Sequence, residues 1–442
     1  MRAASPPSGS LPFRPRYAWT VFALTFALML SDFMTRNVIS AVLPALKRDW
    51  VLNDSQLGAL VSVVPLLVGV AAWPISLLAD RWGHVRSITL MAGLWCLATI
   101  ACGFSQNHTQ MLLARAALGL GEAAYGSVGG AILARVFPAA RLSAILGAFS
   151  AGGAFGTVLG VAAGGVIAAA YGWQAAFIGV GVGSLVFVVL FPILVREQSP
   201  AAHHHSHATA ARAIRRLRLA ATLREIFAAR SAAYTYVGAG LQMLILGVLG
   251  AWIPSFLARE YDLPADRAGL QAALIILVAA VGMIVGGGLA DRTARSKPRR
   301  KLEAAAAYTF TSFVLLTVAF ALPPGLAQLA TLSLGALIAG AHIGVVSAVV
   351  INVTHPGLRA TALGTLVLFN NLLGLAPGPF IVGLLSDATS LKTALTVVPV
   401  AGVLAAACFL RAARTYERDR AAGDWHQLPP VSRGQDGGEA FR

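Results

Sequence analysis

The sequence predicts an all-α protein that crosses a membrane many times. Composition, long apolar stretches and charge distribution carry that prediction. Of the 442 residues, 57% are hydrophobic and only 12% are charged, which is about half the charged share of a soluble protein. A helix needs about 20 apolar residues to cross a hydrocarbon core roughly 30 Å thick, and such stretches recur along the whole sequence. Short segments of alternating hydrophobicity, typical of a membrane β-barrel, do not occur.

The apolar stretches predict twelve membrane-spanning helices. They cover residues 17–43, 55–79, 87–105, 109–134, 143–168, 174–195, 232–257, 267–290, 302–322, 327–351, 359–386 and 391–410. An even number of spans puts both termini on one side of the membrane, and we expect that side to be the cytoplasm. The three cysteines, Cys96, Cys102 and Cys408, fall within spans, which favours packing over a disulfide or metal site.

Positive charge is distributed unevenly between the predicted loops. With a cytoplasmic N-terminus, 27 of the 34 lysines and arginines lie on the inner side, five lie outside and two lie within spans. Such an excess in cytoplasmic loops is the pattern that orients membrane helices. It accounts for the net charge of +16 without nucleic acid as a partner. The proline-rich, basic start followed directly by a full-length span does not resemble a cleavable signal peptide.

A long loop, residues 196–231, divides the predicted spans into two halves of six, 17–195 and 232–410. The polar segments 1–16 and 411–442 are expected to be disordered and cytoplasmic. Within the loop, the run from His203 to His207 has the chemistry to bind a metal. Because no acidic or cysteine partner accompanies it, a flexible tether is favoured. Residues 212–230 alternate arginines with apolar residues at helical spacing, which is typical of an amphipathic helix on the inner membrane face.

The two halves carry an internal repeat. Ser76–Arg81 reads SLLADR after the second span, and Gly287–Arg292 reads GGLADR after the eighth. The aspartates Asp80 and Asp291 therefore occupy equivalent inner loops. Parallel repeats of six helices with a binding site between them form one large transporter architecture.

The loop after the second span resembles the signature of the major facilitator superfamily, G-x-L-A-D-R-x-G-R-R. The matching residues are Asp80, Arg81, Gly83 and Arg86, and Ser76, His84 and Val85 depart from the pattern. Arg115–Tyr125 (RAALGLGEAAY) is similar to the fourth helix of anion:cation symporters and spinster-like lipid transporters. The stretch from Arg359 through Asn370 to Asp387 also resembles that branch. The resemblance extends over nearly all twelve spans and implies the major facilitator fold and transport by alternating access.

Two departures from relatives bear on mechanism. The first span of relatives usually carries an Asp-Arg pair, whereas here Thr35 precedes Arg36 and Asp32 lies one turn earlier on the same helix face. Arg135 stands where relatives tend to place an aspartate, and we expect it to pair with Asp80. The resemblance implies a gating role on the cytoplasmic side for Asp80, Arg81, Gly83, Arg86, Arg135, Asp291, Arg292 and Arg359.

Four ionisable residues lie within predicted spans: Asp32, Arg36, Arg115 and Glu122. Charges in hydrocarbon are costly and usually face a cavity or a partner. At about 1.5 Å per residue, the arginines lie roughly 10 Å below the outer surface and the acids roughly 16 to 20 Å below it. Arginine suits recognition of a carboxylate or phosphate, and a carboxylate in a partly dry cavity exchanges protons closer to neutrality. We predict that Glu122 is the main proton carrier and Asp32 assists. The alternative is two ion pairs that only tie helices together.

By family analogy, the second half completes the cavity. Its polar candidates are Gln242, His342, Asn370 and Asn371, and Tyr125 is a candidate from the first half. For His342 and Tyr125, a packing role is an equal alternative. Pro377 and Pro379 are expected to interrupt the eleventh span and give it a hinge.

The sequence thus predicts a secondary transporter that moves a small organic anion by proton-coupled symport, as a functional monomer in the cytoplasmic (inner) membrane. Its expected partners are the anionic solute and membrane lipids, with the coupling proton in place of a cofactor. A spinster-like carrier of lysolipids or other amphiphiles and a drug or metabolite exporter are the alternatives. A sensor would need an effector domain, which neither the loop nor the tail resembles. An enzyme is not expected, because no nucleophile–base pair or phosphate-binding loop is present.

Overall fold

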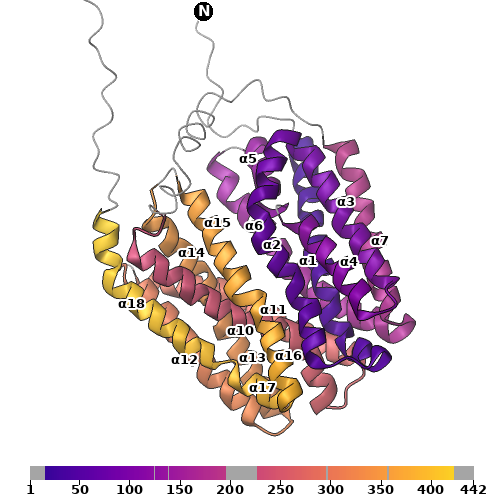
Figure 1. Ribbon diagram of the computed structural model, residues 1–442. Coiled ribbons are helices and arrows are strands. Elements are labelled where there is room, and N and C mark those ends of the chain that lie inside the picture. Colours follow the sequence, from indigo (N-terminus) through magenta and orange to yellow (C-terminus); the bar gives the residue numbers. More distant parts are fainter. Residues whose placement is uncertain are drawn as a thin grey trace, which may run out of the picture.

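The computed structural model describes residues 15–123, 125–137, 139–195, 226–294, 297–355 and 358–422. In these residues the regular elements are helices, arranged as two bundles that lie side by side (Figure 1). The first bundle contains α1 (Pro15–Trp50), α2 (Asp54–Trp82), α3 (His84–Gly103), α4 (His108–Glu122), α5 (Tyr125–Val136), α6 (Ala139–Tyr171) and α7 (Trp173–Leu194).

The second bundle contains the C-terminal helices. They are α10 (Arg230–Glu260), α11 (Ala265–Thr293), α12 (Arg300–Ala321), α13 (Leu326–Gly340), α14 (His342–Asn352), α15 (Arg359–Phe369), the π-helix η3 (Asn370–Leu375), α16 (Pro377–Ala388), α17 (Leu391–Val397) and α18 (Val400–Ala422). The π-helical turn directly precedes Pro377, which lacks the backbone N–H needed to continue a regular α-helix. The predicted interruption of the eleventh span therefore lies at η3.

The described residues contain 11 helices that are long and apolar enough to cross a membrane, where the sequence predicts twelve. The difference concerns the predicted span 109–134. It is divided into α4 and α5, of 15 and 12 residues, each shorter than the roughly 20 residues that a crossing needs. The division follows Glu122; of the two residues between the pieces, Ala123 forms a turn and position 124 lies outside the described residues.

Several predicted segments lie wholly or mostly outside the described residues. They are the histidine run, most of the predicted amphipathic helix 212–230, and positions 1–14 and 423–442. The last helix continues to Ala422, past the predicted boundary at 410. It continues because Ala412 and Tyr416 are buried in the second bundle, and because Asp419 accepts a 2.7 Å hydrogen bond from the backbone N–H of Ser231.

Among the described residues, buried apolar side chains form three clusters, and one of these joins the two bundles. That cluster contains Val42 and Leu57 from the first bundle and Trp252 and Val382 from the second. The other two clusters lie each within one bundle. The bundles therefore share a core at the end of the molecule where α1 ends and α2 begins, which we call the closed end.

Candidate functional site

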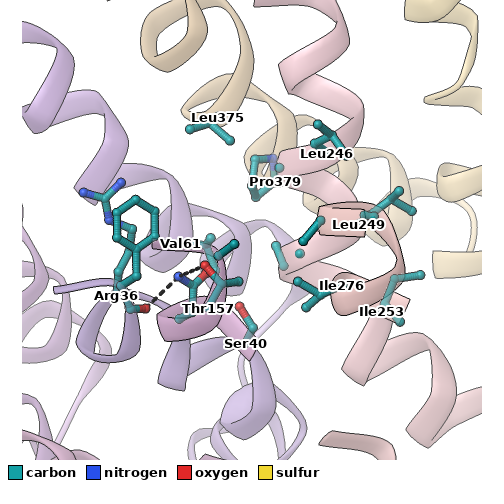
Figure 2. A pocket seen from close by; sticks show the side chains of 18 of the residues that line it. Arg36, Ser40, Val61, Thr157, Leu246, Leu249, Ile253, Ile276, Leu375 and Pro379 are labelled. Carbon is teal, nitrogen blue, oxygen red and sulfur yellow. Dashed lines mark hydrogen bonds between the residues drawn. The ribbon is translucent and has the colours of Figure 1, made fainter. Parts of the chain in front are cut away.

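A cavity of about 220 Å³ lies between the two bundles (Figure 2). α1, α2, α4 and α6 form one wall, and α10, α11, α13, η3 and α16 form the other. Every polar or charged side chain of the lining comes from the first bundle: Arg36, Asn37, Ser40, Arg115 and Thr157. The lining residues of the second bundle are all apolar, and those labelled in Figure 2 are Leu246, Leu249, Ile253, Ile276, Leu375 and Pro379.

Arg36 and Glu122 form an ion pair that joins α1 to α4. Nε and Nη2 of Arg36 donate to Oε2 of Glu122 at 2.8 and 2.7 Å. The Glu122 side chain is 0% exposed, whereas that of Arg36 is 17% exposed. The guanidinium also lies 5.1 Å from the ring centroid of Phe33, a cation–π contact. The cation therefore faces the cavity, with the carboxylate behind it.

Asp32 is buried near Glu122, and the two carboxyl groups interact electrostatically. No N–H or O–H group of the described residues donates to Oδ1 of Asp32 or Oε1 of Glu122. Two carboxylates offer acceptors and no donor, so this contact is attractive only when one group carries a proton. The geometry suits the two acids to hold one proton between them.

Arg115 is fully buried, and its contacts differ from the pairing with Glu122 that the sequence allows. Its Nε donates to the carbonyl of Leu60 at 2.7 Å, and its Nη2 donates to the carbonyl of Arg36 at 3.2 Å. Nη1 is buried and has no hydrogen-bond partner among the described residues. Arg115 therefore ties α4 to α1 and α2, and it is one of the residues that line the cavity.

Three further polar residues of the wall were not predicted from the sequence. Asn37 donates from Nδ2 to the carbonyl of Phe33 at 2.8 Å and to Oγ1 of Thr157 at 3.3 Å. Ser40 lies one helical turn beyond Arg36 on α1. Its position at i+4 from a cavity arginine is the signal that could have identified it.

Two predicted residues of the second half lie in its core, away from the cavity wall. Gln242 is buried and donates to Oγ of Ser312 at 3.1 Å and to the carbonyl of Ala339 at 3.4 Å. Nδ1 of His342 lies 2.9 Å from the same carbonyl, and its ring packs 6.5 Å from that of Phe409. Both side chains pack at the junction of α13 and α14.

Tyr125, Asn370 and Asn371 also lie outside the cavity lining. The hydroxyl of Tyr125 donates to the carbonyl of Thr25 at 2.6 Å, and its ring packs against Trp95 at 5.1 Å. The two asparagines belong to η3, where Asn371 donates to the carbonyl of Val367 at 2.9 Å. These contacts hold helices together and do not face a bound solute in this cavity.

The predicted gating residues lie at the opposite end from the closed end. Gly83 links α2 to α3 with φ +90°, a conformation that favours glycine. Asp291 pairs with Lys301 of the same bundle at 2.6 Å. The remaining predicted gating residues with described side chains are Arg86, Arg135, Arg292 and Arg359. The side chains of Asp80 and Arg81, and with them the predicted Arg135–Asp80 pair, lie outside the described residues.

An ionic latch that was not predicted holds the closed end together. Arg259 of the second bundle donates from Nη1 and Nη2 to the two oxygens of Asp54, each at 2.7 Å. Lys47 also pairs with Asp54 at 2.6 Å, and Ser386 donates to it. Asp387 accepts hydrogen bonds from the first two backbone N–H groups of α2, at 2.6 and 2.8 Å.

Comparison with known proteins gives a consistent result. The family model described as Major Facilitator Superfamily matches residues 24–379. An MFS-type efflux pump of Mycolicibacterium smegmatis is 27% identical over 420 residues, 92% of this chain and 95% of its own length. Protein spinster homolog 1 of Xenopus tropicalis is 24% identical over 436 residues, 92% of this chain and 82% of its own length.

Among solved structures, a bacterial homolog of the human lysosomal transporter Spinster, in an inward-facing and unoccupied conformation, has the same fold. Its TM-score is 0.82 at 20% identity, over 92% of this chain and 99% of that chain. The family match covers most of the sequence, and the two bundles enclose a cavity as a transporter requires. The chain belongs to the Major Facilitator Superfamily and is a secondary transporter, not an enzyme.

Proposed function

We propose that the protein moves an organic anion by alternating access, in symport with protons. The observation that carries this proposal is the position of Arg36 at the cavity wall, with Glu122 behind it and the unpaired Nη1 of Arg115 nearby. Arginine keeps its charge at any working pH and binds carboxylate or phosphate through a planar fork. An anion that enters the cavity meets this positive wall.

The Arg36–Glu122 pair provides a route for coupling. An anion that takes the guanidinium fork of Arg36 competes with Oε2 of Glu122. A buried carboxylate that loses its counter-charge is stabilised by taking up a proton. Binding of the anion and protonation of the Asp32–Glu122 pair then favour each other, which is the requirement for symport.

The arrangement of the bundles supports alternating access around this cavity. The closed end is held by the shared core and by the Asp54 latch, while each bundle keeps its own core elsewhere. By the distribution of lysine and arginine, we place the closed end outside, both termini in the cytoplasm and the protein in the cytoplasmic membrane.

One observation favours a second candidate, a spinster-like carrier of lysolipids or other amphiphiles. The wall contributed by α10, α11, α13 and α16 is entirely apolar. A hydrophilic acid would leave this wall poorly matched, whereas an anion with an apolar body would contact both walls. The substrate that satisfies both observations is an organic anion whose charged group and apolar body lie at opposite ends.

The proposal is tested by transport in proteoliposomes that contain a pH-sensitive dye. A sugar acid, an aromatic acid and a lysophospholipid are added outside in sodium-free buffer. We expect one of these anions to acidify the lumen beyond the level of protein-free liposomes. Arg36→Gln should abolish that excess, whereas Arg267→Gln, at an exposed position, should keep it. Equal acidification by Arg36→Gln would contradict the anion site.

A further inference from the structure

The apolar wall of the cavity contains a recess at Gly250. Leu246, Gly250 and Ile253 all line the cavity from α10 and, at spacings of four and seven residues, share one helix face. A Cβ atom on Gly250 would meet no atom within 4 Å. By contrast, a Cβ on the neighbouring cavity glycine, Gly247, would lie 3.0 Å from Cδ2 of Leu375. At Gly250 the cavity therefore reaches the helix backbone.

Helix packing does not account for this glycine. Elsewhere on α10, a Cβ on Gly240 would lie 2.9 Å from the carbonyl oxygen of Phe369, so that position requires close approach of two backbones. Gly250 has no such neighbour, and its φ lies outside the left-handed region. A glycine inside a helix is less stable than alanine there. Gly250 is therefore less favourable for helix stability than alanine would be. A side chain at this position would fill only open cavity space.

The recess lies across the cavity from the charged wall. Arg36 and Arg115 belong to α1 and α4, whereas Gly250 belongs to α10, and Figure 2 shows Arg36 and the labelled α10 side chains on opposite sides. An anion held by the arginines therefore directs the rest of its structure toward α10. We infer that Gly250 is a specificity-determining residue: its recess receives the apolar body of the transported anion and sets the largest body that fits.

The inference rests on the proposed anion transport for the orientation of the solute, and its physical consequence is a dependence on length. Burial of each methylene group in an apolar site raises affinity about fourfold. That gain continues only while the body finds space in the recess. A leucine side chain at position 250 would occupy the space, so short bodies would bind as before and long bodies would be excluded.

The experiment measures dissociation constants for the full chain in nanodiscs with two series of probes. The acids are phenylacetate, 4-phenylbutanoate and 6-phenylhexanoate, and the alcohols are the phenylalkanols of the same lengths. Gly250→Leu is compared with Gly183→Leu. Gly183 is an exposed position of α7 where a Cβ also meets nothing within 4 Å and which does not line the cavity.

In the unaltered protein and in Gly183→Leu, we expect affinity to rise about fourfold per added methylene in both series. Gly250→Leu should bind phenylacetate within twofold of the unaltered protein and bind 6-phenylhexanoate at least tenfold more weakly. An unchanged length dependence in Gly250→Leu, or no binding of either series by the unaltered protein, overturns the inference. If Gly250→Leu does not fold, Gly250→Ala replaces it. Weaker binding of the longest probe alone then supports the recess, and unchanged binding contradicts it.

The two series separate this inference from the proposed function. If alcohols show the Gly250-dependent length effect but Arg36→Gln leaves the affinity for acids unchanged, the recess stands and the anion site fails. If Arg36→Gln weakens the acids but Gly250→Leu keeps the full length dependence, the anion site stands and the recess fails.

Discussion

Glu122 is the residue on which the proposed coupling depends, because it accepts both Arg36 N–H groups and interacts with the second buried acid, Asp32. Glutamine at this position keeps an oxygen acceptor for Arg36 but cannot take up a proton. We expect Glu122→Gln to abolish uphill accumulation driven by a pH gradient while retaining counterflow exchange in proteoliposomes. The control is Glu303→Gln, which removes the exposed α12 pair with Arg299. Undiminished uphill uptake by Glu122→Gln would remove its role as proton carrier.

At this scale, the sequence identified the two arginines of the cavity wall and the two buried acids, and not their hydrogen-bond partners. Four ionisable residues were identifiable because a charged side chain within a membrane span is costly and usually faces a cavity or a partner. They are Asp32, Arg36, Arg115 and Glu122. Asp32 and Arg36 share a face of α1, so the sequence left a pairing within that helix open; in the structure Arg36 bonds across to Glu122, and Arg115 bonds to backbone carbonyls. Residue spacing shows which side chains share one face of a helix. It does not show which face of α1 meets α4, because that depends on packing between helices that no local sequence pattern specifies.

The start of α2 meets the ends of α10 and α16 in one ionic latch around Asp54, which is the element-scale feature of the closed end. Asp54→Asn removes the negative charge between Lys47 and Arg259 and leaves two cations close together. We expect faster hydrogen–deuterium exchange in residues 54–58 and 383–388. Asp49→Asn is the matched control, because Asp49 accepts from Trp173 within one bundle. Equal exchange in the two variants would show that the latch does not hold this end closed.

Most helices were predictable from their apolar stretches, and the exceptions have physical causes. The fourth span divides into α4 and α5 just after Glu122, the buried acid that pairs with Arg36. η3 was predicted only as an interruption of the eleventh span at Pro377 and Pro379. The latch was not predicted, because acidic and basic residues in loops are common and are usually solvated. The apolar lining was not predictable, since an apolar residue on a membrane helix looks the same whether it faces lipid, a core or a cavity.

For the whole molecule, the closed end depends on close approach of the two bundles at glycines. A Cβ on Gly58 would collide with the carbonyl of Pro379 and lie 2.9 Å from Cα of Phe380. We expect Gly58→Leu to shift the population toward a state in which the bundles separate at this end. Spin labels at the exposed Arg48 and Arg267, one on each bundle, should report a longer distance component.

Gly93→Leu is the control for that measurement, because a Cβ on Gly93 of α3 meets nothing within 4 Å. Its distance distribution should match that of the unaltered protein. If Gly58→Leu also leaves the distribution unchanged, close packing at Gly58 does not keep the bundles together. Because both variants replace a helical glycine by leucine, the difference between them isolates the contact between bundles.

The two unlike walls of the cavity have a consequence for how such a carrier diversifies. Every ionisable group that the proposed coupling uses is encoded before residue 123, and the surface that would fit the cargo is encoded after residue 245. Substitutions on α10 can therefore change which molecules are accepted while the energy source stays the same. A lineage built on this plan can acquire new cargo without rebuilding its proton chemistry.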